Sequence, residues 1–233
     1  MSDLYKIKYE FNFKDIDQKV YEIVINTKDM NIVYPEMKNK PDWTKLEYEQ
    51  CACCPYTPEK VPFCPIAINI ADLVHEFKDM VSYEDCVVKC TTEERTYLKK
   101  VDVQEGLCAI LGLINATSNC SVLNLFKPMA RFHLPFATVE ETLVRTTSFY
   151  LLRQYFKSKK GLEPDFELKD LEKHYSKIQV LNEGLLARID KISKTDADTN
   201  AMVILHSLSQ MFSFSIEDSL SSVAFLFEND DIL

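Results

Sequence analysis

The chain has 233 residues, of which 46% are hydrophobic and 27% charged, the composition of a soluble globular protein that can bury a substantial core. Its net charge of −9 disfavours nucleic acid and anionic lipid as partners, and its four glycines argue against glycine-rich phosphate loops. The first residues lack the apolar segment of a secretory signal, and no run of 18 apolar residues occurs, so we expect a cytoplasmic protein without a membrane span.

The first part of the chain is rich in strand patterns. Residues 5–13 alternate between apolar and polar side chains, the period of two that is typical of a half-buried strand. Residues 19–26 follow a polar turn as a second strand, and we expect the two to form a hairpin with one aromatic face. Residues 31–34 are a candidate for a short third strand. Residues 81–98 look extended and are expected to pair with the hairpin.

Between these strands, residues 51–67 form a loop that holds four of the eight cysteines and four of the nine prolines. Cys51 and Cys54 have the two-residue gap that allows both sulfurs of one turn to bind one ion, with Zn–S bonds of about 2.3 Å. Cys64 precedes Pro65, a residue favoured in the first turn of a helix, so the helix dipole would favour a thiolate at Cys64.

A closed tetrahedral site needs a fourth ligand, and Cys120 is the strongest candidate ahead of Cys53, Cys86, Cys90 or a histidine. The predicted metal ligands are therefore Cys51, Cys54, Cys64 and Cys120. Zinc is the expected metal, with an iron–sulfur cluster as the alternative. Two other interpretations remain open, namely that the cysteines are small buried hydrophobic residues or that two of them form a redox-active pair.

Helical patterns begin at Pro65, where apolar residues at spacings of three and four predict a helix to about Met80. From residue 102 onward the chain is helical in pattern. Asp102 and Glu105 resemble a capping box and open a helix that is apolar on nearly every side, which predicts a central, buried position. A short helix is expected at residues 121–126.

The next helix has the clearest boundaries in the sequence. Thr138 and Glu141 form a second capping box, and Gly161 lies just past the expected end at about Lys159. Apolar side chains surround much of the circumference at residues 148–152, which predicts a core position.

Three further helices complete the pattern. Asp165 is a candidate cap for a helix whose apolar stripe continues to Ile189, residues 203–212 carry the next stripe, and Ser215 opens a last helix to Phe227. Together the patterns predict an α+β fold in which an N-terminal antiparallel sheet with the cysteine-rich loop packs on a C-terminal helical bundle. The boundary is expected near residue 100, between a part of residues 1–100 and a part of residues 101–233 that form one integrated domain.

The segment 129–135, before the capping box, is a second candidate site. Its final proline disfavours helix at the preceding residue, so we expect an extended segment with Arg131 and His133 on one face. The segment leads into a helix N-terminus, where free backbone N–H groups attract anions. One interpretation is a pocket for a small anion, with His133 as base or ligand. The other is a structural pair of Arg131 with a glutamate such as Glu140, beside a hydrogen-bonded core histidine.

Glu141 and Arg145 are four residues apart on the same expected helix. Oppositely charged residues at this spacing commonly pair on the helix surface. We therefore assign Arg145 no further role from the sequence.

Four segments together resemble an uncharacterised family of bacterial proteins of similar length. They are Cys51-x-x-Cys54-Pro with Cys64-Pro-Ile-Ala, Gly106-Leu to Cys120, Pro128-Met-Ala-Arg-Phe-His-Leu-Pro-Phe-Ala-Thr, and Glu140-Glu-Thr through Tyr155-Phe. The resemblance supports the positions of the candidate sites and implies no established activity. Related sequences typically carry Cys-Pro at the position of Cys120, and here Ser121 replaces that proline but leaves the sulfur available.

The sequence contains no nucleophile elbow, Walker loop, dinucleotide-binding fingerprint or His-Glu-x-x-His motif. We therefore favour a cytoplasmic regulatory or interaction protein that has a structural zinc ion and a protein partner. One alternative is a metal- or thiol-dependent enzyme that combines the cysteines with Arg131 and His133. Another is a sensor that binds a small anionic ligand at Arg131. A closed four-ligand site would favour the first hypothesis, and an open coordination position facing a pocket would favour the enzyme.

Overall fold

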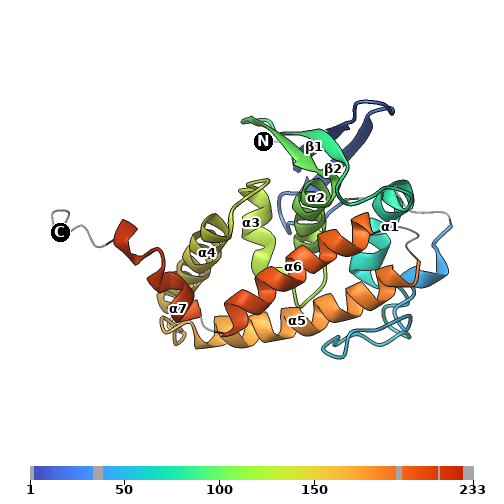
Figure 1. The fold of residues 1–233 in the computed structure, drawn as a ribbon. Helices are drawn as coiled ribbons and strands as arrows, with labels where there is room; N and C mark the ends of the chain where they lie inside the picture. Colours follow the sequence, from blue (N-terminus) through green and yellow to red (C-terminus); the bar gives the residue numbers. More distant parts are fainter. Residues whose placement is uncertain (1–2, 34–38, 193–195, 215, 228–233) are drawn as a thin grey trace.

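The computed structural model describes residues 3–33, 39–192, 196–214 and 216–227 (Figure 1). The strands are β1 (Leu4–Asn12), β2 (Lys19–Asn26), β3 (Asp85–Thr91) and β4 (Thr96–Asp102). The helices are α1 (Pro65–Phe77), α2 (Val103–Thr117), α3 (Lys127–Arg131), α4 (Val139–Lys159), α5 (Lys169–Asp190), α6 (Ala197–Phe214) and α7 (Ile216–Ser221). The predicted α+β class, with the sheet N-terminal to most of the helices, is confirmed.

The four strands form one antiparallel sheet in the order β2-β1-β3-β4. The period of two in β1 buries one face, because Tyr5, Ile7, Tyr9 and Phe11 are at most 5% exposed while the residues between them are not buried. The predicted hairpin and its pairing with the second extended element are therefore confirmed. The candidate third strand is not: within the described residues of that segment, Ile32 makes only an isolated bridge.

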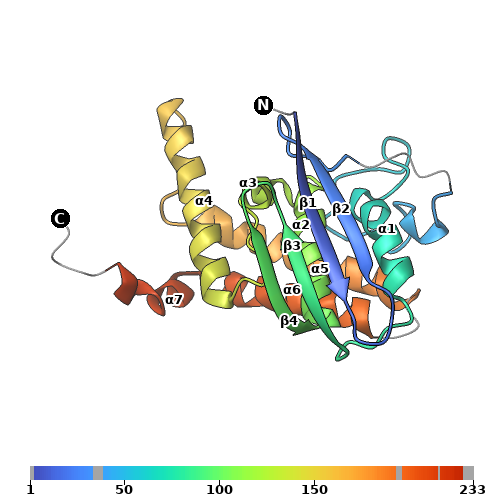
Figure 2. The same cartoon turned by 90° about the horizontal axis from the view of Figure 1, so that it is seen from above.

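The sheet covers one side of a helical layer. Figures 1 and 2 show β1–β4 lying over α1 and α2, with α5 and α6 on the opposite side of α2. The layers meet where the ring of Phe11 packs edge-on against that of Phe77 in α1, with 5.1 Å between ring centroids. Buried side chains of the sheet and the helices belong to one continuous hydrophobic cluster.

Three predicted helix boundaries are confirmed at the level of individual hydrogen bonds. Asp102 accepts a bond from the backbone N–H of Glu105 at the start of α2, at 2.9 Å. At the start of α4, the Glu141 N–H donates to Thr138 Oγ1 at 3.1 Å, while the Thr138 N–H donates to Glu141 Oε2 at 2.8 Å. Gly161 follows α4 with a φ of 70°, a conformation that favours glycine.

Helix α5 begins four residues later than the position of its predicted cap. Leu168 occupies the N-cap position with a left-handed φ of 61°. The Asp165 carboxylate nevertheless accepts bonds from the backbone N–H groups of Lys169 and Asp170, at 3.3 and 2.8 Å. Asp165 therefore does satisfy free N–H groups of the first turn, as expected, although from outside the N-cap position.

Four other expectations are wrong. Residues 127–131 form the short helix α3 rather than an extended segment, because Pro128 lies in its first turn and Pro135 constrains only its immediate neighbour. The short helix expected at 121–126 is a 3₁₀ turn at Asn124–Phe126. Helix α1 ends at Phe77, before Met80, and the last predicted helix is divided into α7 and a 3₁₀ turn at Ala224–Leu226, with Ser215 outside the described residues.

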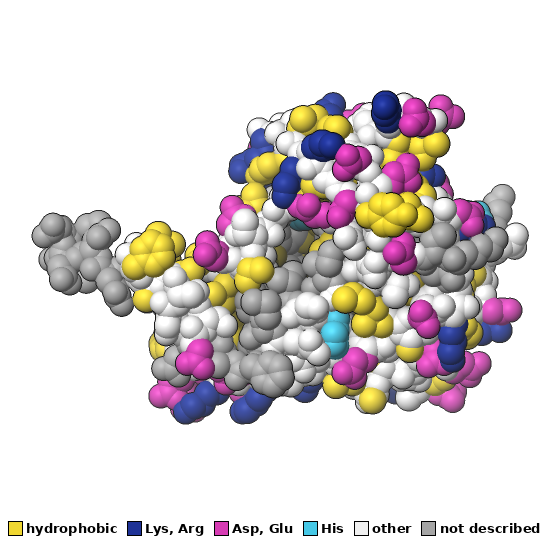
Figure 3. All heavy atoms as spheres, viewed as in Figure 1, with side chains coloured by type: hydrophobic (Ala, Val, Ile, Leu, Met, Phe, Trp, Pro, Cys, Tyr) yellow, Lys and Arg dark blue, Asp and Glu magenta, His cyan; other side chains and the backbone are white. Residues whose placement is uncertain are grey.

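The core position predicted for residues 148–152 is confirmed only at Tyr150, which is 6% exposed, and the aromatic side chains that follow on α4 are exposed as well. Leu152, Tyr155 and Phe156 are 50, 49 and 56% exposed. Figure 2 shows the reason, because α4 lies past the β4 edge of the sheet and extends beyond the helical layer. No helix in the described part of the chain is long and apolar enough to cross a membrane. On the face shown in Figure 3, Lys and Arg side chains over the sheet alternate with Asp and Glu.

Candidate functional site

The cysteine-rich loop is fixed to the helical layer on two sides. Backbone bonds from the Cys64 N–H to the Thr44 carbonyl, and from the Leu46 N–H to the Pro62 carbonyl, join its two ends at 2.8 and 2.9 Å. Cys64 is the N-cap of α1, as predicted, and is buried. On the other side, Cys51 packs against Gly184 of α5 so closely that a methyl group at residue 184 would lie 2.8 Å from the Cys51 Cβ.

This arrangement brings together cysteines that are distant in the sequence. The pKa of the Cys51 thiol is raised to about 12, mainly by burial and further by the neighbouring thiols of Cys64, Cys53, Cys54 and Cys120. A negative charge on any of these neighbouring sulfurs would therefore raise the pKa of Cys51 further.

Cys120, which follows α2, has the surroundings of a metal-binding thiolate. Burial is the main cause that raises the pKa of its thiol to about 11, and the backbone N–H groups of Val122 and Leu123 oppose that rise. The Cys51–Cys54 segment forms a tight turn, in which the Cys54 N–H donates to the Cys51 carbonyl at 2.9 Å. Backbone N–H groups aimed at sulfur stabilise its charged form.

A buried cation lies beside these thiols. Arg188 of α5 is only 2% exposed and donates to the backbone carbonyls of Trp43, Lys45, Leu46 and Glu49, with distances of 2.8, 3.3 and 3.5 Å to the last three. No carboxylate forms a salt bridge with it in the part of the chain that the structure describes. Burial lowers its pKa, while Cys64 and Cys51 are the two strongest opposing influences.

The other cysteines have different surroundings. Cys86 and Cys90 are buried on one face of β3. Cys53 donates to the Lys177 carbonyl of α5 at 3.3 Å. Cys108 of α2 lines a cavity. Among all described residues, no group of three or more His, Cys, Asp or Glu side chains is placed so that it could hold a metal ion.

The structure separates the two residues of the second predicted site. Arg131, at the end of α3, forms a salt bridge with Glu94 at 3.1 Å and lies over the ring of Tyr5 at 4.2 Å. It thus pairs with a glutamate of the β3–β4 turn, whereas the sequence interpretation named Glu140 as an example. His133 Nε2 lies 2.5 Å from the Tyr9 hydroxyl of β1. Arg131 and His133 do not share a face as expected, because α3 ends at Arg131 and His133 lies in the segment that follows the helix.

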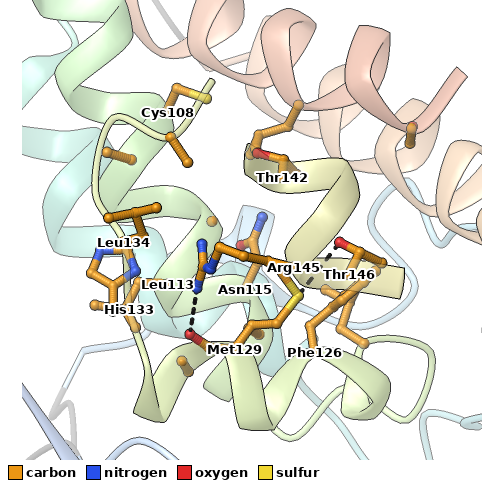
Figure 4. Close-up of a pocket in the computed structure, with 18 of the residues that line it drawn as sticks. Cys108, Leu113, Asn115, Phe126, Met129, His133, Leu134, Thr142, Arg145 and Thr146 are labelled. Carbon is orange, nitrogen blue, oxygen red and sulfur yellow. Dashed lines mark hydrogen bonds between the residues drawn. The ribbon is translucent and has the colours of Figure 1, made fainter. Parts of the chain in front are cut away.

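His133 lines a cavity of about 420 Å³ between α2, α3, α4, α5 and α6. Figure 4 shows Arg145 of α4 extending across this cavity towards Met129, with His133 and Asn115 beside it. Arg145 Nη2 donates to the carbonyls of Met129 and Phe132, at 3.3 and 2.7 Å.

The sequence interpretation missed Arg145 because it assigned that residue to a surface pair with Glu141. In the structure, Glu141 caps Thr138 instead. The capping box could be read from the sequence and could have shown that Glu141 does not pair with Arg145. In a capping box the Glu141 carboxylate accepts a bond from the Thr138 N–H at the helix N-terminus, on the side away from Arg145.

The environment of His133 predicts a specific loss of stability in acid. Burial, and secondly the charge of Arg145, lower the pKa of His133 to about 3. The unfolded chain, with an ordinary histidine pKa of about 6.5, therefore binds a proton that the folded chain rejects as the pH falls from about 6.5 towards 3. This residue should reduce the free energy of unfolding by up to about 1.4 kcal/mol per pH unit below 6.5.

Urea unfolding at pH 7.0, 6.0 and 5.0 measures this effect. We expect the wild-type protein to lose more stability between pH 7 and 5 than the His133→Gln variant does, whatever the cost of that substitution at pH 7. His75→Gln is the matched control, because it removes a histidine that is exposed on α1 and lies outside the cavity lining. Equal slopes in the wild type and His133→Gln would contradict a buried neutral imidazole.

These features define an α+β protein with a thiol cluster at one end of its helical layer and a cavity within it. A family model described as Domain of unknown function (DUF6901) matches residues 7–228, and the chain belongs to this family. This match confirms the resemblance to an uncharacterised family. Comparisons with curated proteins and with solved structures find no match to the chain.

Proposed function

We propose that this protein is a cytoplasmic zinc-binding regulatory or interaction protein. Cys51, Cys54, Cys64 and Cys120 would hold a structural zinc ion that fastens the cysteine-rich loop to the start of α1 and the end of α2. The observation that carries the proposal is that Cys54, Cys64 and Cys120 lie near enough to Cys51 to raise the pKa of its thiol, although the four residues come from three separate segments.

The balance of charge supports the same site. Burying an uncompensated cation costs several kcal/mol, so buried cations normally have an anionic partner. Arg188 has four backbone carbonyls as acceptors and the thiols of Cys64 and Cys51 as neighbours. A zinc ion with four thiolate ligands carries a net negative charge, and Arg188 would compensate part of it.

Zinc binding would require a change in the side chains. No three of the described His, Cys, Asp or Glu side chains are placed to hold an ion, so the cysteine side chains would have to move, for example by rotation about χ1, to form a tetrahedral site. The ion would also displace the thiol protons, which makes its affinity dependent on pH. An iron–sulfur cluster held by the same four residues remains the alternative cofactor.

Two features bear on the alternative functions. Arg131 and His133 already have partners in the sheet, Glu94 and Tyr9, which weakens an enzyme that uses them together with the cysteines. The exposed apolar side chains on α4, including Tyr155 and Phe156, favour a protein partner with an apolar surface.

Elemental analysis of the purified, reduced protein tests the proposal. We expect about one zinc ion per chain, and we expect a chelator to lower the melting temperature by about 5 °C or more, a loss of roughly 2 kcal/mol for a chain of this size. Iron in place of zinc would support the alternative cofactor.

Matched cysteine variants give the control. Cys51→Ala and Cys120→Ala should abolish binding of the metal, whereas Cys86→Ala and Cys108→Ala remove cysteines outside the cluster and should retain it. Absence of metal, together with a melting temperature that does not respond to the chelator, would leave the cysteines as buried hydrophobic residues.

A further inference from the structure

The cavity between the helices lies apart from the proposed zinc ligands, and its side chains match a particular class of ligand. Its volume of about 420 Å³ falls within the roughly 300–1,000 Å³ of small-molecule sites. Much of its described lining is apolar and comes from several helices. These side chains include Leu113, Phe126, Met129, Leu134, Phe136 and Ile178.

Arg145 gives the cavity a positive charge. Its Nη2 atom donates to two backbone carbonyls, but in the described part of the chain no carboxylate forms a salt bridge with Arg145 and no acceptor is bonded to its Nε or Nη1 atoms. A guanidinium group remains charged in proteins and binds a carboxylate through two N–H groups. Arg145 therefore has donors left for an anion.

Asn115 gives the cavity an acceptor that needs a donor. This residue of α2 is 6% exposed and lines the cavity, and its Oδ1 atom has no hydrogen-bond partner among the described residues. A buried polar atom without a partner is costly and uncommon in folded proteins. A hydroxyl or N–H group on a ligand would satisfy it.

The other ionisable groups of the lining do not cancel the charge of Arg145. Glu105, the acidic residue among the described lining residues, forms a salt bridge with Lys99 at 2.5 Å. His133 is neutral and is bonded to Tyr9. Glu141, which also acts on Arg145 electrostatically, lies outside the described lining and accepts a bond from the Thr138 N–H, so the cavity itself keeps the positive charge of Arg145.

We propose that this cavity binds a small monocarboxylic acid with an apolar body and a hydroxyl or N–H group. Its carboxylate contacts Arg145, its donor group contacts Asn115, and its body fills the apolar space between α2, α3 and α5. This site is independent of the proposed zinc ion.

Isothermal titration calorimetry on the full chain tests the chemical class. The probes are decanoate, 1-decanol, and the 2-, 3- and 10-hydroxy forms of decanoate, each below its micelle-forming concentration. Decanoate should bind at least about 10-fold more tightly than decanol, because an added hydrogen bond to a charged group is worth a factor of roughly 10 to 100. At least one hydroxydecanoate should bind more tightly than decanoate.

Variants assign the contacts. Arg145→Gln should weaken decanoate binding by about 10- to 100-fold and leave decanol binding unchanged. Asn115→Ala should remove the advantage of the hydroxydecanoate over decanoate. Arg131→Gln is the matched control, because Arg131 is a nearby cation that pairs with Glu94 and lies outside the cavity lining. This substitution should change the affinities by less than about twofold.

Gly112→Leu keeps the experiment decisive if loss of Arg145 prevents folding. A Cβ atom at Gly112 would meet only the Leu205 Cδ2 atom, at 3.8 Å, so a larger side chain can enter the cavity while Arg145 stays in place. This variant should fold, as judged by circular dichroism, and bind none of the acids. Equal affinity of the wild type for decanoate and decanol, no binding of any acid, or unchanged binding in Gly112→Leu would each overturn the proposal.

Discussion

Replacement of Arg188 by methionine is expected to lower the free energy of unfolding by about 3–5 kcal/mol, one of the two largest effects that we predict. The guanidinium group is buried and donates to the carbonyls of Trp43, Lys45, Leu46 and Glu49. Methionine fills a similar volume but donates no hydrogen bond, so the four carbonyls lose this donor, although the Lys45 carbonyl still accepts a bond from the Tyr48 N–H at 3.2 Å. Each unsatisfied acceptor costs about 1–3 kcal/mol before the loop relaxes.

Urea unfolding at pH 7 measures the change, with Arg153→Met as the control. Arg153 is exposed on α4, and its substitution should change stability by no more than about 0.5 kcal/mol. Arg188→Lys should give an intermediate result, because an ammonium group cannot reach carbonyls spread over seven residues with the planar fork of a guanidinium. A loss below about 1 kcal/mol for Arg188→Met would mean that the loop does not depend on α5 for its shape.

The sequence specified the parts of the fold that depend on neighbouring residues. The period of two in β1 placed Tyr9 and Phe11 on the buried face, and the capping box at Thr138 and Glu141 fixed the start of α4. The position of Cys64 at the start of α1 could be predicted from Pro65 alone. Such patterns work because their hydrogen bonds and side-chain directions are set within a few residues.

The errors arose where the outcome depends on packing partners far away in the chain. The apolar circumference of α4 suggested a buried helix, but nothing in its own sequence indicates that it extends past the edge of the sheet. Arg131 and His133 were expected on one face because Pro135 was given more weight than Pro128, which lies in the first turn of α3, and Arg131 ends that helix while His133 lies beyond it.

The candidate sites show the same division. The spacing of Cys51 and Cys54 suggested a metal site, whereas the role of Arg188, 124 residues beyond Cys64 in the chain (188 − 64), depends entirely on how α5 packs. The cavity was not visible in the sequence at all, since residues of five helices line it. Buried polar groups of this kind are recognised only when the surrounding elements are in place.

Two glycine-to-alanine substitutions, each in the interior of a helix, should have opposite effects. Alanine favours a helix over glycine by about 0.5–1 kcal/mol, and Gly112→Ala should gain this amount because its Cβ enters open space beside Leu205. Gly184→Ala should instead lose about 1–3 kcal/mol, because its Cβ would lie 2.8 Å from the Cβ and 2.9 Å from the Cα of Cys51. The expected difference between the two variants is roughly 1.5–4 kcal/mol.

Thermal and urea unfolding of both variants measure this difference, which corresponds to roughly 2–4 °C per kcal/mol for a chain of this size. Metal content provides a second measurement. If Gly184→Ala moves Cys51 away from Cys64, the variant should also retain less zinc, whereas Gly112→Ala should retain the wild-type amount. If Gly184→Ala is as stable as Gly112→Ala, then Cys51 does not lie tightly against α5, and the convergence of thiols on which a metal site depends would not hold.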